Sequence, residues 1–89
     1  MTDPYEIRYV AQAVEDLQQL PARITRQVLN KIERLAENAT IVSHHAMKGT
    51  WAGYFRIRVG DYRVIYRLDH ERRMITIERI GHRGKVYRD

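Results

Sequence analysis

The stretch Tyr54-Phe55-Arg56-Ile57-Arg58-Val59-Gly60-Asp61-Tyr62-Arg63-Val64-Ile65-Tyr66 decides how the second half of this chain folds. Two runs rich in β-forming residues, 54–59 and 62–68, flank Gly60-Asp61. A two-residue loop that begins with glycine is typical of a type II′ hairpin turn. Such a loop fixes the register, so we expect Val59 to face Tyr62, Arg58 to face Arg63, and the pairing to continue until Tyr54 faces Arg67.

Alternation along the two predicted strands separates an apolar face from a cationic one. The apolar face, which we expect to form core, receives Phe55, Ile57, Val59, Tyr62, Val64, Tyr66 and Leu68. The opposite face receives Tyr54, Arg56, Arg58, Arg63, Ile65 and Arg67. Like charges directly opposite each other cost a few tenths to about 1 kcal/mol. A sequence that keeps this cost indicates that the arginines bind a ligand; the alternative is a solvated face paired with Glu78 or Asp69.

Outside the hairpin, the sequence predicts two more strands and two helices. Residues 5–10 alternate in polarity, and residues 74–80 form a last apolar run before a basic tail at 82–89. A first helical stripe ends at Pro21 and contains Val10, Val14, Leu17 and Leu20. A second stripe follows at Ile24, Val28, Ile32, Leu35 and Ala39, with Asn38 suited to the helix C-cap. Residues 40–50 have no firm period and predict a connector with some extended structure.

This order of elements predicts an α+β fold in one domain spanning residues 1–89. An N-terminal strand, a two-helix hairpin and a three-stranded antiparallel meander should form a four-stranded, largely antiparallel sheet, with both helices on one face. A domain of this size buries little more than ~60% of the surface that its unfolded chain exposes. The length therefore excludes a Rossmann or barrel enzyme.

Composition removes several further classes. The chain has no cysteine, which excludes a disulfide scaffold, a thiolate zinc site, an iron–sulfur cluster and a cysteine nucleophile. No secretory signal is present, and no apolar stretch approaches the ~20 residues that span a bilayer, so we expect a cytoplasmic protein. His44 and His45 are neighbours without a carboxylate at metal-ligand spacing. We therefore expect surface loop histidines, and neither a metal nor a cofactor.

The positive charge is concentrated in the second half of the chain. The net charge of +5 combines 16 basic with 11 acidic residues. Residues 1–47 hold five basic and six acidic residues, whereas residues 48–89 hold eleven basic and five acidic residues. Clustered cations attract polyanions and gain affinity when counterions are released. The asymmetry favours a phosphate-bearing or acidic partner; an ordinary basic surface is the alternative.

The tail adds cations and one aromatic ring to this half, at His82, Arg83, Lys85 and Tyr87. Arginine and aromatic side chains together suit single-stranded RNA, because guanidinium binds phosphate bidentately and rings stack on splayed bases. Tyr87 as a mere packing residue is the alternative. We expect RNA contacts from Lys48, Tyr54, Arg67 and Lys85.

Four segments together resemble the RelE/ParE superfamily of bacterial and archaeal type II toxins. They are the Leu20-Pro21 junction, Met47-Lys48-Gly49, the hairpin, and the ending Ile80-Gly81-His82-Arg83-Gly84-Lys85-Val86-Tyr87. The resemblance covers essentially the whole chain and implies the RelE-like microbial RNase fold. It favours the RelE branch, whose members are endoribonucleases that enter the ribosomal A site and cut mRNA. The ParE branch, which inhibits DNA gyrase, and a non-catalytic RNA-binding module are the alternatives.

The resemblance also implies partners: a cognate antitoxin protein in a hetero-oligomer, mRNA and the ribosome. It implies catalytic positions as well. The family's two basic residues on the first hairpin strand fall at Arg56 and Arg58, its arginine after the turn at Arg63, its arginine after the last strand at Arg83, and its C-terminal tyrosine at Tyr87. The best-known RelE members have lysines at the first two positions. A guanidinium is too basic to act readily as a general base.

The expected mechanism is metal-free cleavage by the adjacent 2′-hydroxyl. We expect Arg56 and Arg63 to clamp the scissile phosphate and Arg58 to stabilise charge. Arg83 should lie near the leaving oxygen, and Tyr87 should stack on or orient a base. His82 is the candidate for proton transfer, because imidazole exchanges protons near neutral pH. In the alternative, the toxin mainly positions the RNA and no residue supplies large acid–base catalysis.

Overall fold

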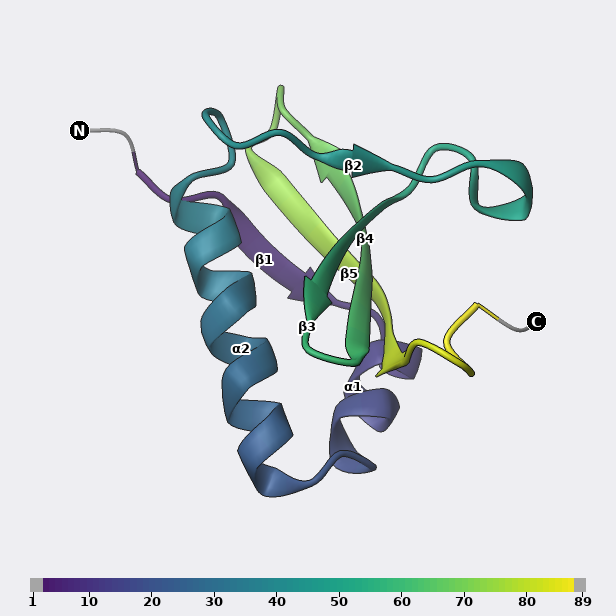
Figure 1. The fold of residues 1–89 in the computed structure, drawn as a ribbon. Coiled ribbons are helices and arrows are strands. Elements are labelled where there is room, and N and C mark those ends of the chain that lie inside the picture. Colours follow the sequence, from purple (N-terminus) through teal and green to yellow (C-terminus); the bar gives the residue numbers. More distant parts are fainter. Residues whose placement is uncertain (1–2, 88–89) are drawn as a thin grey trace.

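A computed structural model, described here over residues 3–87, has two helices and a five-stranded sheet in the order β1-β5-β4-β3-β2 (Figure 1). The strands are β1 (Glu6–Tyr9), β2 (His45–Ala46), β3 (Phe55–Val59), β4 (Tyr62–Asp69) and β5 (Met74–His82). The helices are α1 (Ala11–Gln18) and α2 (Ala22–Glu37), with a 3₁₀ turn, η1 (Gly49–Trp51), before β3. The α+β class is confirmed. The predicted strand count of four is wrong, because the connector after α2 adds β2 at the edge of β3.

The β3–β4 hairpin has the predicted register, with Val59 opposite Tyr62 and Arg58 opposite Arg63. Gly60 has a φ of +59°, whereas Asp61 has no positive φ. A positive φ at the first loop position alone is the pattern of a type II′ turn. Tyr54 lies just before the strand.

β5 joins the hairpin to the N-terminal strand. It pairs antiparallel with β4 and parallel with β1. The register with β4 shifts just after Ile65, and this bulge leaves two consecutive polar residues, Glu78 and Arg79, between the core residues Ile77 and Ile80. The run at 74–80 is therefore a bulged strand, which its simple apolar pattern did not indicate.

The core lies between the helices and the apolar face of the sheet (Figure 1). On α2, the predicted stripe is confirmed: Val28 and Ile32 are fully buried and Leu35 is nearly so. The stripe predicted on α1 is partly wrong. Val14 is 42% exposed, while Ala13 and Asp16 are buried.

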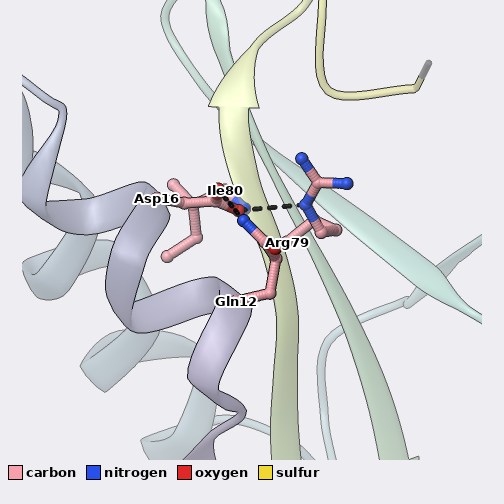
Figure 2. A network of polar contacts seen from close by, with 4 residues as sticks. All are labelled: Gln12, Asp16, Arg79 and Ile80. Carbon is pink, nitrogen blue, oxygen red and sulfur yellow. Dashed lines mark hydrogen bonds and ion pairs between the residues drawn. The ribbon is translucent and has the colours of Figure 1, made fainter. Parts of the chain in front are cut away.

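Asp16 holds α1 against the edge of β5 (Figure 2). Because α1 follows β1 directly, it lies beside the part of β5 that β1 leaves unpaired. One carboxylate oxygen of Asp16 accepts the backbone N–H of Ile80 at 2.9 Å and the Nε–H of Arg79 at 3.1 Å. The other accepts the side-chain amide of Gln12 at 3.0 Å. The carboxylate thus satisfies a backbone donor at the sheet edge and neutralises a half-buried cation.

His44 is not the surface residue that the sequence predicted. Its Nε2 donates to the carbonyl oxygen of Ala39 at 2.8 Å. Since a carbonyl only accepts, Nδ1 carries the lone pair and receives the hydroxyl of Tyr66 at 2.7 Å. That hydroxyl belongs to a fully buried side chain, and burial raises the pKa of Tyr66 to about 12. These bonds fix the connector on the sheet and place the next residue, His45, at the edge of β3.

Candidate nucleic-acid interface

The tail after β5 projects on the side of the sheet away from α2, as does the segment around η1 (Figure 1). Val86 is 2% exposed, and its Cβ lies 3.3 Å from the position that a Cβ on Gly81 would occupy. Only glycine permits this close approach without a shift. Val86 and Ile65 are both buried, yet both lie outside the helix-covered core. The close packing of Val86 against Gly81 fixes the tail, and the next residue, Tyr87, reaches Arg56.

Arg56 lies in a pocket of about 380 Å³ that is bordered by β2, η1, β3 and the tail. We call this hollow the Arg56 pocket; it is lined by Ala46, Met47, Lys48, Trp51, Arg56 and Tyr87. Nη1 of Arg56 donates to the Tyr87 hydroxyl at 3.5 Å, and Nη2 donates to Nε2 of His45 at 3.0 Å. Both partners are uncharged groups that receive a hydrogen bond from a cation.

No carboxylate neutralises this part of the cationic face within residues 3–87. None of the ion pairs found there includes Lys48, Arg56 or Arg58. Lys48 and Arg58 are exposed, and no hydrogen bond involves their side chains in the described part of the chain. The three cations are therefore free to bind an anion.

Arg63 and Arg83 lie at the turn end of the hairpin. Nη1 of Arg63 donates to the carbonyl oxygens of Gly60 and Tyr62, both at 2.9 Å, and the residue is only 9% exposed. These bonds reduce the repulsion between the opposed Arg58 and Arg63, because the guanidinium of Arg63 is hydrogen-bonded to backbone carbonyl oxygens. The backbone N–H of Arg83 donates to the carbonyl of Asp61 at 2.8 Å. The exposed side chains of Arg83 and Asp61 also approach each other, with Nε 4.0 Å from Oδ1. An exposed ion pair at this distance contributes little to stability.

His82 and Lys85 lie in a different place from the Arg56 pocket. His82 is opposite Tyr62 on β4, with ring centroids 5.6 Å apart, and Gly81 is opposite Arg63. Because side chains alternate between faces, His82 points to the helix-covered side of the sheet and Arg63 to the other side. His82 and Lys85 line a second pocket, of about 340 Å³, beside α1.

The structure thus divides the predicted site residues into three groups. Lys48, Arg56 and Tyr87 share the Arg56 pocket, and Tyr54 contacts the pocket residue Trp51. Arg58 and Arg63 continue along the same face toward the hairpin turn, and Arg83 lies beside Asp61 in that turn. His82, Lys85 and Arg67 are apart from both groups, and Arg67 donates to the carboxylate of Glu78 at 2.6 Å.

Trp51 and His45 also belong to this region, although the sequence does not predict them there. Trp51 lines the pocket, and its ring stands perpendicular to that of Tyr54 with centroids 5.2 Å apart. Its place three residues before Tyr54 was the available signal. His45 reaches Arg56 only because β2 pairs with β3, which no local pattern reveals. Within residues 3–87, no cluster of three histidines or acidic residues is arranged to hold a metal ion. No helix in that range is long and apolar enough to cross a membrane.

Comparison with known proteins places this arrangement in a family. Residues 7–87 match the family described as the ParE toxin of the type II toxin–antitoxin system parDE. The chain belongs to this toxin family. Toxin RelG of Mycobacterium tuberculosis (strain ATCC 25618 / H37Rv) is 33% identical over 85 residues, which span 96% of this chain and 98% of that protein.

Solved structures of related toxins share the fold of this toxin. The toxin of the RelBE2 toxin–antitoxin complex from Mycobacterium tuberculosis aligns with a TM-score of 0.79 and 33% identity, covering 90% of this chain and 99% of that one. The archaeal RelE–RelB complex from Pyrococcus horikoshii OT3 gives a TM-score of 0.73 and 28% identity, covering 94% of this chain and 100% of that one. The predicted membership of the RelE/ParE superfamily is confirmed.

Proposed function

We propose that this toxin is a metal-independent endoribonuclease that cleaves mRNA in the ribosomal A site and arrests translation in the cytoplasm. The Arg56 pocket carries this proposal. It combines two cations that no carboxylate neutralises, Lys48 and Arg56, with two aromatic rings, Trp51 and Tyr87. Cations of this kind bind phosphate, and such rings stack on unpaired bases. The names of the relatives, RelG and RelE, support the same branch of the superfamily.

The chemistry rests on stabilising negative charge at the scissile phosphate. Arg56 donates only to uncharged partners, and a phosphate oxygen makes a stronger, charge-assisted bond with the same N–H groups. Arg58 adds a second positive charge about 7 Å further along β3, the spacing of alternate residues in a strand. Arg63 is nearly buried and donates to the carbonyl oxygens of Gly60 and Tyr62, so it supports the turn whose Asp61 carbonyl accepts the backbone N–H of Arg83. Arg83 then faces the leaving 5′ oxygen.

A protein antitoxin is the proposed partner, in a hetero-oligomer with the toxin. The RelBE2 and RelE–RelB structures are complexes of a toxin with an antitoxin. A partner segment rich in acidic residues would complement the cationic face between Arg56 and Arg83. Such a segment would compete with RNA for the same side chains.

Brief induction of the toxin in bacteria, followed by mapping of mRNA 5′ ends, tests the proposed activity. We expect in-frame cuts and arrested translation for the wild type, and loss of both for Arg56→Ala at an unchanged Tm. Arg72→Ala is the matched control, because Arg72 is an exposed arginine beside Asp69 on the other hairpin loop and should leave the cuts unchanged. Intact mRNA contradicts the proposal. DNA damage signalling without cuts indicates gyrase inhibition, and RNA binding without cuts indicates a non-catalytic module.

A further inference from the structure

His45 presents an unprotonated ring nitrogen to Arg56, at the edge of the sheet beside the Arg56 pocket. It pairs with Arg56 across β2 and β3, so both side chains lie on the same face of the sheet. Nη2 of Arg56 lies 3.0 Å from Nε2 of His45. A guanidinium has donors only, so Nε2 must offer its lone pair and the ring proton must be on Nδ1. The imidazole is therefore held in the form that can accept a proton.

We propose that His45 is the general base that takes the proton of the attacking 2′-hydroxyl, an inference that rests on the proposed ribonuclease function. Arg56 and Arg58 cannot serve, because a guanidinium does not give up its proton. When the scissile phosphate takes the N–H groups of Arg56, the lone pair of His45 becomes available beside that phosphate. Arg56 thus holds the base ready before RNA binds and stabilises charge afterwards.

The three other histidines of the chain are committed elsewhere. His44 uses both ring nitrogens, on the carbonyl of Ala39 and the hydroxyl of Tyr66. Nδ1 of His70 is hydrogen-bonded to the hydroxyl of Tyr5. His82 points to the helix-covered side of the sheet, and its Nδ1 accepts the backbone N–H of Gly84 at 3.2 Å. Of the four histidines, only His45 has a hydrogen bond with Arg56.

The groups around His45 are two cations and a phenol, so the negative charge that favours proton uptake by its ring comes from the phosphate of the bound RNA. Arg56 faces it from β3, Lys48 follows it before η1, and Tyr87 reaches Arg56 from the tail. Within residues 3–87, no hydrogen bond or ion pair joins His45 to a carboxylate. In the RNA complex, the phosphate would take over the N–H groups of Arg56, and the 2′-hydroxyl would replace Arg56 as the hydrogen-bond partner of His45.

The step balances without a further reactant other than water. The 2′ oxygen bonds to phosphorus while its proton passes to Nε2 of His45. The bond from phosphorus to the 5′ oxygen breaks, and that oxygen takes a proton from solvent water. The imidazolium returns its proton to the solvent, and Arg56 again donates to Nε2. The products are a 2′,3′-cyclic phosphate and a 5′-hydroxyl.

Single-turnover cleavage of ribosome-bound mRNA from pH 5.5 to 8.5 tests the role of His45. His45→Gln keeps an acceptor for Arg56 but cannot take a proton, so we expect a rate about 100-fold lower. We also expect loss of the rise in rate with pH that the wild type shows, at unchanged RNA affinity and Tm. His82→Gln, the competing assignment, should retain that rise. A wild-type pH profile in His45→Gln, or its loss in His82→Gln alone, overturns the proposal.

Chemical rescue supplies a second, independent readout. We expect free imidazole to restore cleavage by His45→Ala in proportion to its unprotonated fraction, which a purely structural role of His45 would not produce. Equal rates for wild type and both His45 variants overturn the role of His45 and leave the ribonuclease function standing. A wild-type toxin that makes no cuts overturns the ribonuclease function itself, and the general base with it.

Discussion

Two arginines from neighbouring parts of one sheet have opposite surroundings. Arg79 on β5 lies 3.1 Å from the buried carboxylate of Asp16, with its side chain 22% exposed (Figure 2). Arg56 on β3 donates to an imidazole and a phenol at the rim of an open pocket. The charge of Arg79 is neutralised by Asp16, and this pair holds α1 on β5. The charge of Arg56 has no carboxylate partner within residues 3–87 and remains available to a ligand. The number of arginines alone does not distinguish these roles, whereas the partner of each arginine does.

The largest effect is expected for Arg56→Ala, which removes the cation from the pocket. RNA cleavage should fall by about 100- to 1,000-fold, as on loss of a charge-stabilising donor. The free energy of unfolding should change by less than about 0.5 kcal/mol, because neither neutral partner is left buried. Cleavage rates and urea denaturation of the same preparation measure both quantities. Unfolding of Arg56→Ala at low urea would place Arg56 in the structural class with Arg79.

Asp16→Ala is expected to show the converse, with a large loss of stability and little direct effect on chemistry. It leaves Arg79 and the backbone N–H of Ile80 without this acceptor at the edge of the core. The cost should be about 3 kcal/mol, the usual penalty for removing one partner of a buried pair. Urea denaturation gives the stability, and cleavage per folded molecule should stay within about threefold of wild type. A stability loss below about 1 kcal/mol would contradict the contrast with Arg56.

Tyr66→Phe extends the comparison to the two neighbouring histidines, of which His44 is hydrogen-bonded to the buried Tyr66 and His45 to Arg56. At pH 7 the loss of the bond to His44 should cost about 1 kcal/mol. Burial raises the pKa of Tyr66 from 10.0 to about 12, so folded protein keeps a proton that the unfolded chain loses. The stability from this group is constant below pH 10 and falls between pH 10 and 12, by an amount on the order of 2 kcal/mol.

Urea denaturation of wild type and Tyr66→Phe at several pH values isolates this residue, because every other titrating group is common to both proteins. The difference between the two free energies of unfolding should shrink as the pH rises above 10. A difference that stays constant up to pH 12 would show that burial does not hold Tyr66 in its neutral form.

Arg67→Ala should have the smallest effect of the four. Arg67 shares the cationic face, but its side chain is 54% exposed and pairs with Glu78 at 2.6 Å. Removal of an exposed ion pair costs at most about 1 kcal/mol, and we expect RNA affinity to fall only about twofold in a filter-binding or fluorescence assay. A hundredfold loss of RNA affinity would show that Arg67 binds RNA even though it is paired with the carboxylate of Glu78.

The sequence predicted those parts of the fold that depend on local chemistry. The turn at Gly60-Asp61 and the alternation beside it gave the hairpin register, and the spacing of apolar residues gave α2. The two-residue β2, the bulge at Glu78 and the burial of Asp16 were missed. Each of these depends on a partner distant in sequence, and an acidic residue on a helix is indistinguishable from a solvated one until that partner is placed.

The candidate site was predicted in part for the same reason. The sequence predicts Arg56 and Tyr87 as site residues, and the structure brings them within hydrogen-bond distance. The sequence predicts His82 for proton transfer from its place in the basic tail and from the chemistry of imidazole. A shift of one residue along a strand exchanges the two faces of a sheet, so His82 lies on the opposite side from Arg63. The prediction of a surface loop histidine at position 45 misses its contact with Arg56, because a connector without a period shows neither the strand nor the neighbour of His45.

The parallel pairing of β1 with β5 has a consequence for the order in which the toxin folds. Glu6 is opposite Met74, so β1 cannot join the sheet until almost the whole chain has been synthesised. The β3–β4–β5 meander needs only short loops to close and should form first, because long loops cost more entropy to close. We expect Ile7→Val to accelerate unfolding and leave the folding rate nearly unchanged, and a slowed folding rate would contradict this order. The strand that leaves the ribosome first is then the last to take its place in the sheet.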